Sequence, residues 1–437
     1  MKISYFLEKV SAQMHSKEAK EYVKSELSQH MQQSKQSWVK RGYSEVEAEK
    51  KAVKEMGSPL TLGKSLNKLH KPKIDWMLVI LLSVTLLLSF LPILALDKGM
   101  YLEITNFTLP TMLQNKTISI IIGFSIAIGF MFIDYRKLKR YGYLFYGVGV
   151  GLLIAISQFA NKIINGESII SLGIIDVQAW VAIPFLLMAW ASFFSNSAFK
   201  LWKGIALYVF SIYFLLFIPS LSMIFIYSVF VAVLFLKSRF SLKEKICTVG
   251  AVILIVIGVV FYHIIAFRNG SLANYQISRI LGFISPNKYA DESGYIYVTL
   301  ENAMKSAGLF GAENLMNLPD PHTNLVLGNI IQTYGFLAGI VLFAILSIFL
   351  IRFWLISRAI KDPFGKLLTI GGVTLFATQF LYSVAMNFGL VPVSTMSLPF
   401  MSYGIMPTVL NAFIVGIVLS VYRRKHFIPL KEDYQAS

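Results

Sequence analysis

The sequence predicts an all-α polytopic membrane protein of about ten transmembrane helices, with a small helical head at its N-terminus. Two observations predict this fold class. Of the 437 residues, 56% are hydrophobic and only 14% are charged, whereas a typical soluble protein has about 25% charged residues. The formal net charge is nevertheless +17, so the charged residues must be segregated from the apolar ones. A single soluble globule, a disordered chain and a nucleic-acid-binding body are excluded, and no nucleic-acid partner is expected.

Residues 1–74 are expected to form a cytoplasmic helical head, because they hold 15 Lys and Arg and 8 Asp and Glu without a long apolar stretch. Ser44 and Glu47 form a capping box ahead of a predicted helix over 45–56. The stretch 42–69 resembles the short helical prefix domain attached to some bacterial membrane permeases and regulators. Two interpretations stay open, a basic head near anionic lipid and a docking module for a cytoplasmic partner.

Residues 75–425 are expected to form the membrane domain, followed by a cytoplasmic tail over 426–437. A bilayer core about 30 Å thick needs about 20 mostly apolar helical residues, since every backbone polar group must be satisfied within the segment. Ten stretches meet this requirement: 76–96, 117–133, 141–160, 177–194, 201–219, 221–236, 247–267, 325–351, 367–388 and 403–422.

The basic residues outside the head predict the orientation of these spans. The connections on one side, with the tail, hold 18 Lys and Arg, and the opposite connections hold seven, among them Lys116. Because short cytoplasmic loops carry the excess of basic residues, both termini are predicted to be cytoplasmic. The one long outer connection, 268–324, is expected to fold against the outer face of the bundle. The sequence has one cysteine, Cys247, which excludes an internal disulfide. Cys247 is interpreted as a small buried hydrophobe.

The motifs of common enzyme classes do not occur: the sequence has no GxxxxGK[ST], HExxH, GxSxG or CxxC. No metal-ligand set and no organic cofactor are therefore expected. Few ionisable residues lie deep in the spans, which disfavours an ion-coupled transporter. Polar residues gather instead at the outer ends of the spans, in clusters over 275–295, 320–324 and 402–404. These clusters either converge on one site or are turn and cap chemistry at helix ends.

Three stretches, in this order and on ten spans, resemble the SEDS family (shape, elongation, division and sporulation), which includes the RodA, FtsW and SpoVE proteins. Residues 279–294 (RILGFISPNKYADESG) resemble the family's R-I-L-x-F-x-x-P followed by G-Y-Q. Residues 318–324 (LPDPHTN) are similar to L-P-E-x-H-T-D. Residues 387–404 (NFGLVPVSTMSLPFMSYG) are similar to N-x-G-L-x-P-x-T-G-x-x-L-P-F-x-S-Y-G. The resemblance covers about residues 75–425.

The resemblance implies a cell-wall role in the bacterial plasma membrane, in cell shape, cell division or sporulation. Such proteins polymerise the disaccharide units of lipid II into glycan strands as peptidoglycan glycosyltransferases, paired with a transpeptidase, and flipping of lipid II has also been proposed for the family. The implied partners are lipid II or another undecaprenyl-linked precursor, a transpeptidase and membrane lipids. A divalent cation, Mg²⁺ or Mn²⁺, is implied with the lipid diphosphate.

The same resemblance assigns the candidate site residues. Asn324 stands at the family's catalytic Asp position, and an amide has no useful basicity, which suggests altered or lost catalysis. Asp320 either takes over as the base or caps the approach to the eighth span. Arg279 either binds a diphosphate or pairs with Asp291 or Glu292. The candidate substrate-binding residues are Arg279, Lys288, His322, Thr323, Ser402 and Tyr403.

Two functions follow from these residues. The first is a glycan polymerase that acts on lipid II with Asp320 as a substitute base. The second is a catalytically impaired scaffold or regulator of the same fold, which binds a lipid-linked precursor or a transpeptidase. A lipid II flippase is a third, disfavoured by the scarcity of charge inside the spans.

Overall fold

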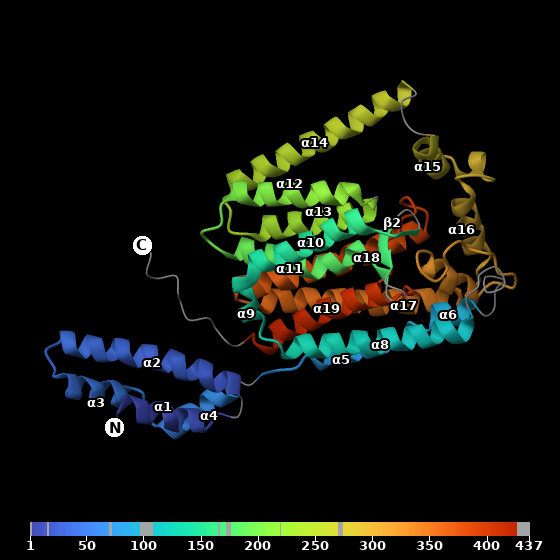
Figure 1. Ribbon diagram of the computed structural model, residues 1–437. Coiled ribbons are helices and arrows are strands. Elements are labelled where there is room, and N and C mark those ends of the chain that lie inside the picture. The colour runs from blue at the N-terminus through green and yellow to red at the C-terminus, as the bar shows by residue number, and fades with distance from the viewer. Residues whose placement is uncertain are drawn as a thin grey trace. The chain divides into compact units, whose positions relative to one another are not determined.

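Figure 1 shows the computed structural model, which describes residues 2–14, 17–69, 72–96, 108–164, 167–171, 176–218, 220–269 and 274–425. The predicted tail over 426–437 lies outside the described residues. The chain divides into two compact units: Met1–Asp75 with Ala359–Asp362 and Val421–Ser437, and Trp76–Arg358 with Pro363–Ser420. Within the first unit, the N–H of Lys73 donates to the carbonyl oxygen of Arg423 (3.3 Å).

Four helices form the N-terminal part of the first unit: α1 (Ile3–Ala12), α2 (Lys17–Lys40), α3 (Glu45–Glu55) and α4 (Pro59–Leu69). Their apolar faces enclose a small core of Phe6, Leu7, Val10, Met14, Val23, Met31 and Val53. The predicted capping box is present at the start of α3. The Ser44 hydroxyl accepts from the N–H of Glu47 (3.4 Å), and a Glu47 carboxylate oxygen accepts from the N–H of Ser44 (3.3 Å).

The helices of the second unit follow the order of the ten expected stretches. Seven helical stretches of the described residues are long and apolar enough to cross a membrane. They are α5 (Trp76–Leu88) with α6 (Leu91–Leu96), α8 (Leu109–Phe132), α9 (Tyr135–Leu138) with η1 (Lys139–Tyr141) and α10 (Gly142–Phe159), α14 (Leu242–Arg268), α17 (Val326–Ala359), α18 (Pro363–Asn387) and α19 (Ile405–Arg423).

Three shorter apolar helices take the fourth, fifth and sixth places in this order. They are η2 (Ala179–Val181) with α11 (Ala182–Ser195), α12 (Leu201–Phe217) and α13 (Leu221–Lys237). The predicted all-α polytopic membrane fold is confirmed by this arrangement. The long connection forms three elements of its own, α15 (Asn274–Ile284), η3 (Pro286–Tyr289) and α16 (Tyr295–Ser306).

A small antiparallel sheet lies between α10 and α11 and was not predicted from the sequence. Its strands are β1 (Lys162–Ile164), β2 (Glu167–Ser171) and β3 (Asp176–Val177), in the order β1-β2-β3. Lys162 pairs with Ile169, and Ile170 pairs with Val177. Isoleucine-rich segments of this kind favour strands. The predicted start of the fourth span at Val177 is therefore too early, since helical backbone begins at Ala179.

The core of the second unit is built around α11, whose residues are almost all buried. This helix packs against α10, α13 and α18. The Trp190 indole N–H donates to the Tyr227 hydroxyl (2.9 Å). A Cβ at Gly149 of α10 would lie 2.9 Å from the Leu186 side chain, so the glycine permits the close approach of α10 and α11.

Helix α14 has the opposite character, because Ala266 alone of its described residues is buried. Cys247 lies near its start and is exposed, so its interpretation as a buried hydrophobe is wrong. The apolar sequence of α14 does not distinguish this helix from the spans that are more buried. An apolar exposed helix in a membrane protein is expected to face lipid.

The second unit has two distinct ends in Figure 1. Helices α6, α15 and α16 lie with strand β2 at one end, and α9 lies at the other. We call the first the long-loop end. The candidate clusters of the sequence all belong to segments that connect helices there, which makes this end the place to look for a site.

Candidate functional site

The two most specific motif segments lie against each other at the long-loop end. We call 318–324 and 398–404 together the motif junction. The N–H of Tyr403 donates to the carbonyl oxygen of His322 (2.7 Å). Their rings are 5.5 Å apart between centroids. Two segments about 80 residues apart in the sequence are thus joined, as their proposed convergence requires.

Three successive carbonyl oxygens of the first segment are each held by a donor from elsewhere. The carbonyl of His322 is the first. The carbonyl of Thr323 accepts from the Ser402 hydroxyl (2.7 Å), and the carbonyl of Asn324 accepts from the Asn387 side-chain amide (3.3 Å). These three carbonyl groups therefore help to fix the backbone of this segment.

The Ser402 and Asn387 side chains that donate to these carbonyls also accept hydrogen bonds. The Ser402 hydroxyl also accepts from the N–H of Leu398 (2.8 Å). The side-chain amide oxygen of Asn387 accepts from the N–H of Gly328, at the start of α17 (2.8 Å). Ser402 and Asn387 are 1% and 0% exposed, so both serve as internal connectors.

A buried lysine supports the second segment of the junction. The ammonium of Lys116 donates to the carbonyl oxygens of Phe400 (2.9 Å) and Ser402 (3.1 Å), and the side chain is fully buried. Phe400 has a φ of 63°, which is uncommon for a residue other than glycine. The ammonium thus stabilises a turn whose carbonyls point into the protein.

The predicted place of Lys116 in an outer connection is wrong. The predicted span began at residue 117, but α8 begins at Leu109, so Lys116 lies inside the helix. Hydropathy cannot separate a lysine that flanks a helix from one whose charge is satisfied by backbone carbonyls. Two such hydrogen bonds compensate part of the cost of burying the ammonium.

Asp320 and Asn324 lie side by side. The Asn324 side-chain amide donates to a carboxylate oxygen of Asp320 (3.4 Å). The backbone carbonyl of Asp320 accepts from the N–H groups of Thr323 (3.1 Å), Asn324 (3.1 Å) and Leu325 (3.2 Å). Asp320 adopts a φ of 47°, a region that Asp tolerates better than most residues. It therefore forms the turn before α17 through its backbone while its carboxylate contacts the candidate catalytic position.

His322 is the most buried titratable group of this turn, at 8% exposed. Burial lowers the pKa of its imidazole below the usual value, because the charged form loses hydration. The Asp320 carboxylate opposes this shift. The neutral imidazole is favoured at pH 7, so the junction adds little positive charge of its own for an anionic ligand.

The two cationic candidates of the long loop lie on α15 and η3. Arg279 is exposed. Its charge acts on Tyr297 of α16, lowering the pKa of that hydroxyl against the larger raising effect of burial. The Tyr297 hydroxyl accepts from the N–H of Val393 (3.1 Å), in the segment that leads to the junction. Lys288 is also exposed, with its ammonium 5.7 Å from the Tyr289 ring.

The glycines of the first family-like stretch explain its compact fold. A Cβ at Gly282 would lie 2.5 Å from the carbonyl oxygen of Ser293, and one at Gly294 would lie 2.3 Å from that of Pro286. Neither glycine tolerates a side chain without a shift of the backbone. This part of the motif therefore shapes the loop that carries Arg279 and Lys288.

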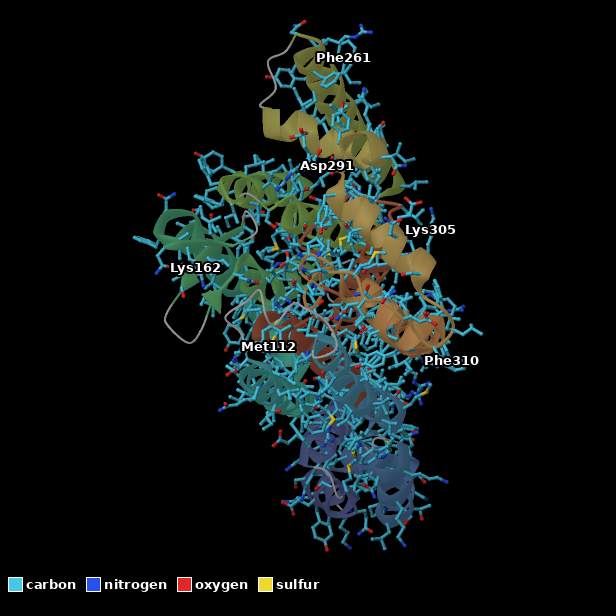
Figure 2. The ribbon with its side chains drawn as sticks, turned by 90° about the vertical axis from the view of Figure 1, so that its right-hand side faces the viewer. Met112, Lys162, Phe261, Asp291, Lys305 and Phe310 are labelled. Atoms are coloured by element: carbon cyan, nitrogen blue, oxygen red, sulfur yellow. The ribbon has the colours of Figure 1, made fainter. Side chains whose placement is uncertain are left out.

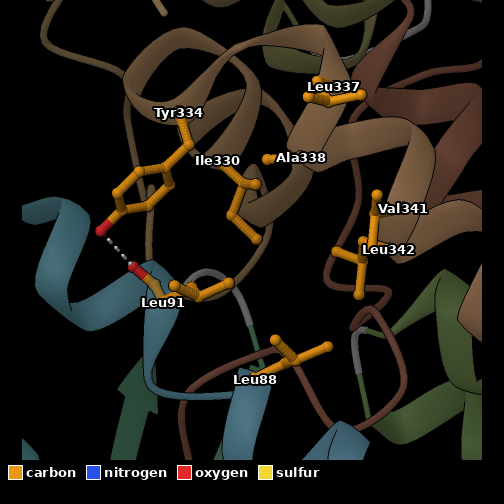
Figure 3. Close-up of a pocket in the computed structure, with 8 residues that line it drawn as sticks. All are labelled: Leu88, Leu91, Ile330, Tyr334, Leu337, Ala338, Val341 and Leu342. Carbon is orange, nitrogen blue, oxygen red and sulfur yellow. Dashed lines mark hydrogen bonds between the residues drawn. The ribbon is translucent and has the colours of Figure 1, made fainter. Parts of the chain in front are cut away.

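An apolar pocket lies apart from these polar groups, between the first span and α17 (Figure 3). Its volume is about 280 Å³. The Tyr334 hydroxyl at its edge donates to the carbonyl oxygen of Leu91 (3.3 Å). The other lining residues are Leu88, Ile330, Leu337, Ala338, Val341 and Leu342. This lining fits hydrocarbon and offers nothing that would bind a phosphate.

The described part of the chain holds no group of three or more His, Cys, Asp or Glu residues that would bind a metal. Asp320 alone provides a carboxylate at the motif junction. The residues present therefore do not fit a cation held by the protein alone. Mg²⁺ in proteins is commonly held by one or two carboxylates together with substrate phosphates.

Comparisons with solved structures first define the class of protein. One chain of a structure described as "Structural coordination of polymerization and crosslinking by a peptidoglycan synthase complex" superposes with a TM-score of 0.66 at 21% identity, covering 80% of this chain and 98% of that chain. The rod shape determining protein RodA of Thermus thermophilus superposes with a TM-score of 0.57 at 20% identity, covering 80% of this chain and 97% of that chain. The protein is a polytopic membrane protein with a RodA-like fold.

The family follows from the sequence comparison. Residues 75–426 match the model of the FtsW, RodA and SpoVE family, described as cell cycle protein. The chain belongs to this family, the SEDS family, as the three motif stretches indicated. It is accordingly a multi-pass membrane protein of a family related to peptidoglycan glycosyltransferases.

Individual relatives are distant. The probable peptidoglycan glycosyltransferase FtsW of Trichlorobacter lovleyi is 31% identical over 162 residues, which cover 36% of this chain and 42% of that protein. The stage V sporulation protein E of Bacillus subtilis is 28% identical over 161 residues, 36% of this chain and 44% of that protein. The matched regions span less than half the length of these two relatives.

Proposed function

We propose that this protein binds an undecaprenyl-linked peptidoglycan precursor, such as lipid II, at its long-loop end and has lost the family's own general base. The observation that carries the proposal is the amide of Asn324 donating to Asp320 at the position where the family motif has its carboxylate. An amide hydrogen-bonds a sugar but does not remove a proton from a hydroxyl. The proposed role is in cell shape, cell division or sporulation.

The arrangement of charge supports binding of a diphosphate. Arg279 and Lys288 are exposed on the long loop. Among the described residues, Arg279 makes no ion pair with Asp291 or Glu292, so its guanidinium is available for bidentate contact with phosphate oxygens. The proposal assigns the diphosphate to these cations, and the sugars to the polar groups of His322, Thr323 and Tyr403.

A transpeptidase partner and the orientation belong to the same proposal. A structural neighbour is described as part of a peptidoglycan synthase complex, which supports a partner that cross-links glycan strands. The basic residues of the connections support cytoplasmic termini in a bacterial plasma membrane. In that orientation the long-loop end faces outward, where the precursor's sugars are used.

Glycan polymerisation with Asp320 as the base is the second candidate. One observation favours it: the Asp320 carboxylate lies within hydrogen-bond distance of Asn324 and thus beside the family's catalytic position. In that case the carboxylate removes the proton of the acceptor hydroxyl as its oxygen bonds the anomeric carbon of the donor sugar. The bond from that carbon to the lipid diphosphate breaks, and the lipid diphosphate is the leaving group. A divalent cation, Mg²⁺ or Mn²⁺, is proposed to arrive with the lipid diphosphate, since the described residues do not build a site for it.

Purified protein in proteoliposomes, given fluorescent lipid II with Mg²⁺ or Mn²⁺, separates the two candidates. The proposal expects lipid II to bind to the wild type without glycan strands on a gel. It expects Asn324→Asp to produce strands, while Asn317→Asp, an equal charge change at an exposed position of the same loop, does not. Two neighbouring carboxylates repel each other when both are ionised, so the pKa of one of the pair formed by Asp320 and the new carboxylate would be raised.

Other outcomes select between the candidates. Strands made by the wild type and abolished in Asp320→Ala would overturn lost catalysis and establish the second candidate. Wild-type protein that fails to bind lipid II, measured by fluorescence anisotropy, would overturn both. Binding without any strands from Asn324→Asp would show that more than this one group has been lost.

A further inference from the structure

Helix α17 is broken where a piece of the long loop enters it. Gly335 has φ 88° and ψ 170°, which interrupts the helix. Segment 308–312 fills the break with three backbone hydrogen bonds: Phe336 N–H to Gly308 O (3.1 Å), Leu337 N–H to Leu309 O (3.2 Å) and Ala312 N–H to Gln332 O (2.7 Å). A Cβ at Gly335 would lie 2.1 Å from the Leu309 carbonyl oxygen, so a side chain there would expel the segment.

The side chains of this inserted segment point away from the protein. Leu309 is 67% exposed and Phe310 is 80% exposed. Figure 2 shows Phe310 at the edge of the long-loop end. Gly311 follows with a φ of 118°, and its Cα approaches the backbone of Thr333 closely. Two large apolar side chains are thus presented by a backbone that is fixed on both sides. We call this pair the Leu309–Phe310 tip.

The length of α17 places the tip relative to a bilayer. A hydrocarbon core about 30 Å thick takes about 20 helical residues at about 1.5 Å each. Arg352 and Arg358 are the basic residues near the other end of α17, so either one could mark the opposite boundary of the hydrocarbon core. About 20 residues back from Arg352 is Gln332, and about 20 residues back from Arg358 is Ala338. The break at Gly335 lies between these limits. The tip is therefore within about 5 Å of the hydrocarbon boundary, whichever arginine marks the opposite one.

Part of the backbone around the tip is hydrogen-bonded. An unsatisfied backbone group is costly in hydrocarbon, so these bonds favour a position at the boundary, with the two side chains rather than the backbone among the acyl chains. Here the N–H of Gly308 donates to the carbonyl of Gly311 (3.2 Å), in addition to the three bonds to α17. The apolar surface also continues onto α17, where Leu337, Ile340 and Val341 are 49%, 60% and 49% exposed.

From these observations we infer that the Leu309–Phe310 tip is a membrane anchor that inserts into the bilayer leaflet at the long-loop end. The tip contacts lipid acyl chains, because it continues a lipid-facing helix at the depth where acyl chains begin. The anchor fixes the height of the long loop above the bilayer. This inference does not depend on which ligand the motif junction binds.

The test uses a spin label at the tip in the full-length chain. In a Cys247→Ser background, which removes the one native cysteine, Phe310→Cys and separately Leu309→Cys are labelled and placed in phospholipid nanodiscs. Relaxation by oxygen, which partitions into lipid, is compared with relaxation by a water-soluble nickel chelate. A label at Lys305→Cys is the control, since Lys305 is an exposed charged residue on α16 of the same loop.

The inference expects oxygen to relax the labels at 309 and 310 several-fold more than the nickel chelate does, and the reverse at 305. Labels at both tip positions that respond to nickel like the control would overturn it. Labels protected from both reagents would overturn it as well, in favour of a tip covered by protein. Two independent tip positions keep the test valid if one variant fails to fold.

Discussion

The motif junction and the exposed surface of α15 and η3 that carries Arg279 and Lys288, which we call the α15–η3 surface, both belong to family-like stretches. Their side chains are used in opposite ways. At the junction, Lys116, Asn387 and Ser402 are almost fully buried and donate to backbone carbonyls. On the α15–η3 surface, Arg279 and Lys288 are exposed. The most recognisable motif is thus a structural joint, while the charge available to a ligand sits on the surrounding loop.

This difference teaches that a recognisable motif can act mainly through its architecture. The junction keeps the residues that hold backbone together and lacks the carboxylate expected at Asn324. Substitutions in the two regions should therefore have different effects. Changes at the junction should lower the stability of the fold, and changes on the α15–η3 surface should weaken ligand binding. Four predictions test this division, in order of decreasing effect on stability.

Lys116→Met should give the largest loss, about 3 kcal/mol in the free energy of unfolding. It leaves the buried carbonyls of Phe400 and Ser402 without their donor, and each unsatisfied group costs about 1–3 kcal/mol. Denaturation in mixed micelles measures the change. Lys305→Met is the matched control, because Lys305 is exposed and pairs only with Glu301 across one helical turn, worth less than about 0.5 kcal/mol. Equal effects of the two variants would contradict a supporting role for Lys116.

Ser402→Ala should destabilise the protein by about 2 kcal/mol. It removes the donor to the Thr323 carbonyl and the acceptor for the N–H of Leu398 at one buried site. Ser306→Ala removes a hydroxyl that bonds only the Ala303 carbonyl of its own helix, and should stay within about 0.5 kcal/mol. A loss as small as in this control would mean that the two segments are held together by other contacts.

Acidification should produce a smaller effect through His322. Its pKa is lowered in the folded state, so the unfolded chain binds more protons around the unfolded pKa of about 6.5. The contribution of the neutral imidazole is complete above that pKa and is lost as the pH falls through the folded value. Unfolding midpoints measured from pH 8 to pH 5 should fall, and His322→Gln should flatten the curve. An unchanged slope in His322→Gln would assign the pH dependence to other groups.

Arg279→Gln and Lys288→Gln should have the smallest effect on stability, within about 0.5 kcal/mol, because both side chains are exposed. Each should weaken binding of a lipid diphosphate about tenfold, through loss of a charge-assisted contact. Lys305→Gln should leave that affinity unchanged. A binding loss that appears only together with a stability loss would place these cations among the structural residues instead.

Much of the fold could be predicted because it follows from local properties. Apolar stretches of sufficient length gave the order of the membrane helices, and Ser44 and Glu47 gave the capping box. The sheet was missed because its short isoleucine-rich strands lie beside apolar spans, where hydropathy does not distinguish them. The burial of Lys116 was missed because it depends on carbonyls about 285 residues later in the chain.

The candidate site could be predicted only as a set of segments. The sequence placed 318–324 and 398–404 at the same end of the bundle, and the structure brings them together. The sequence did not reveal that Ser402 points inward, or that the Asp320 backbone forms the turn before α17. Those features depend on long-range hydrogen bonds, which leave no periodic signal.

The held carbonyl of residue 324 has an evolutionary consequence. Since Asn387 binds the backbone oxygen of residue 324, which every amino acid possesses, this contact places no demand on the identity of the side chain at that position. Codons for Asn and Asp differ by one base. Under the proposed function, a single mutation at position 324 therefore removes or restores the acid while the fold stays intact.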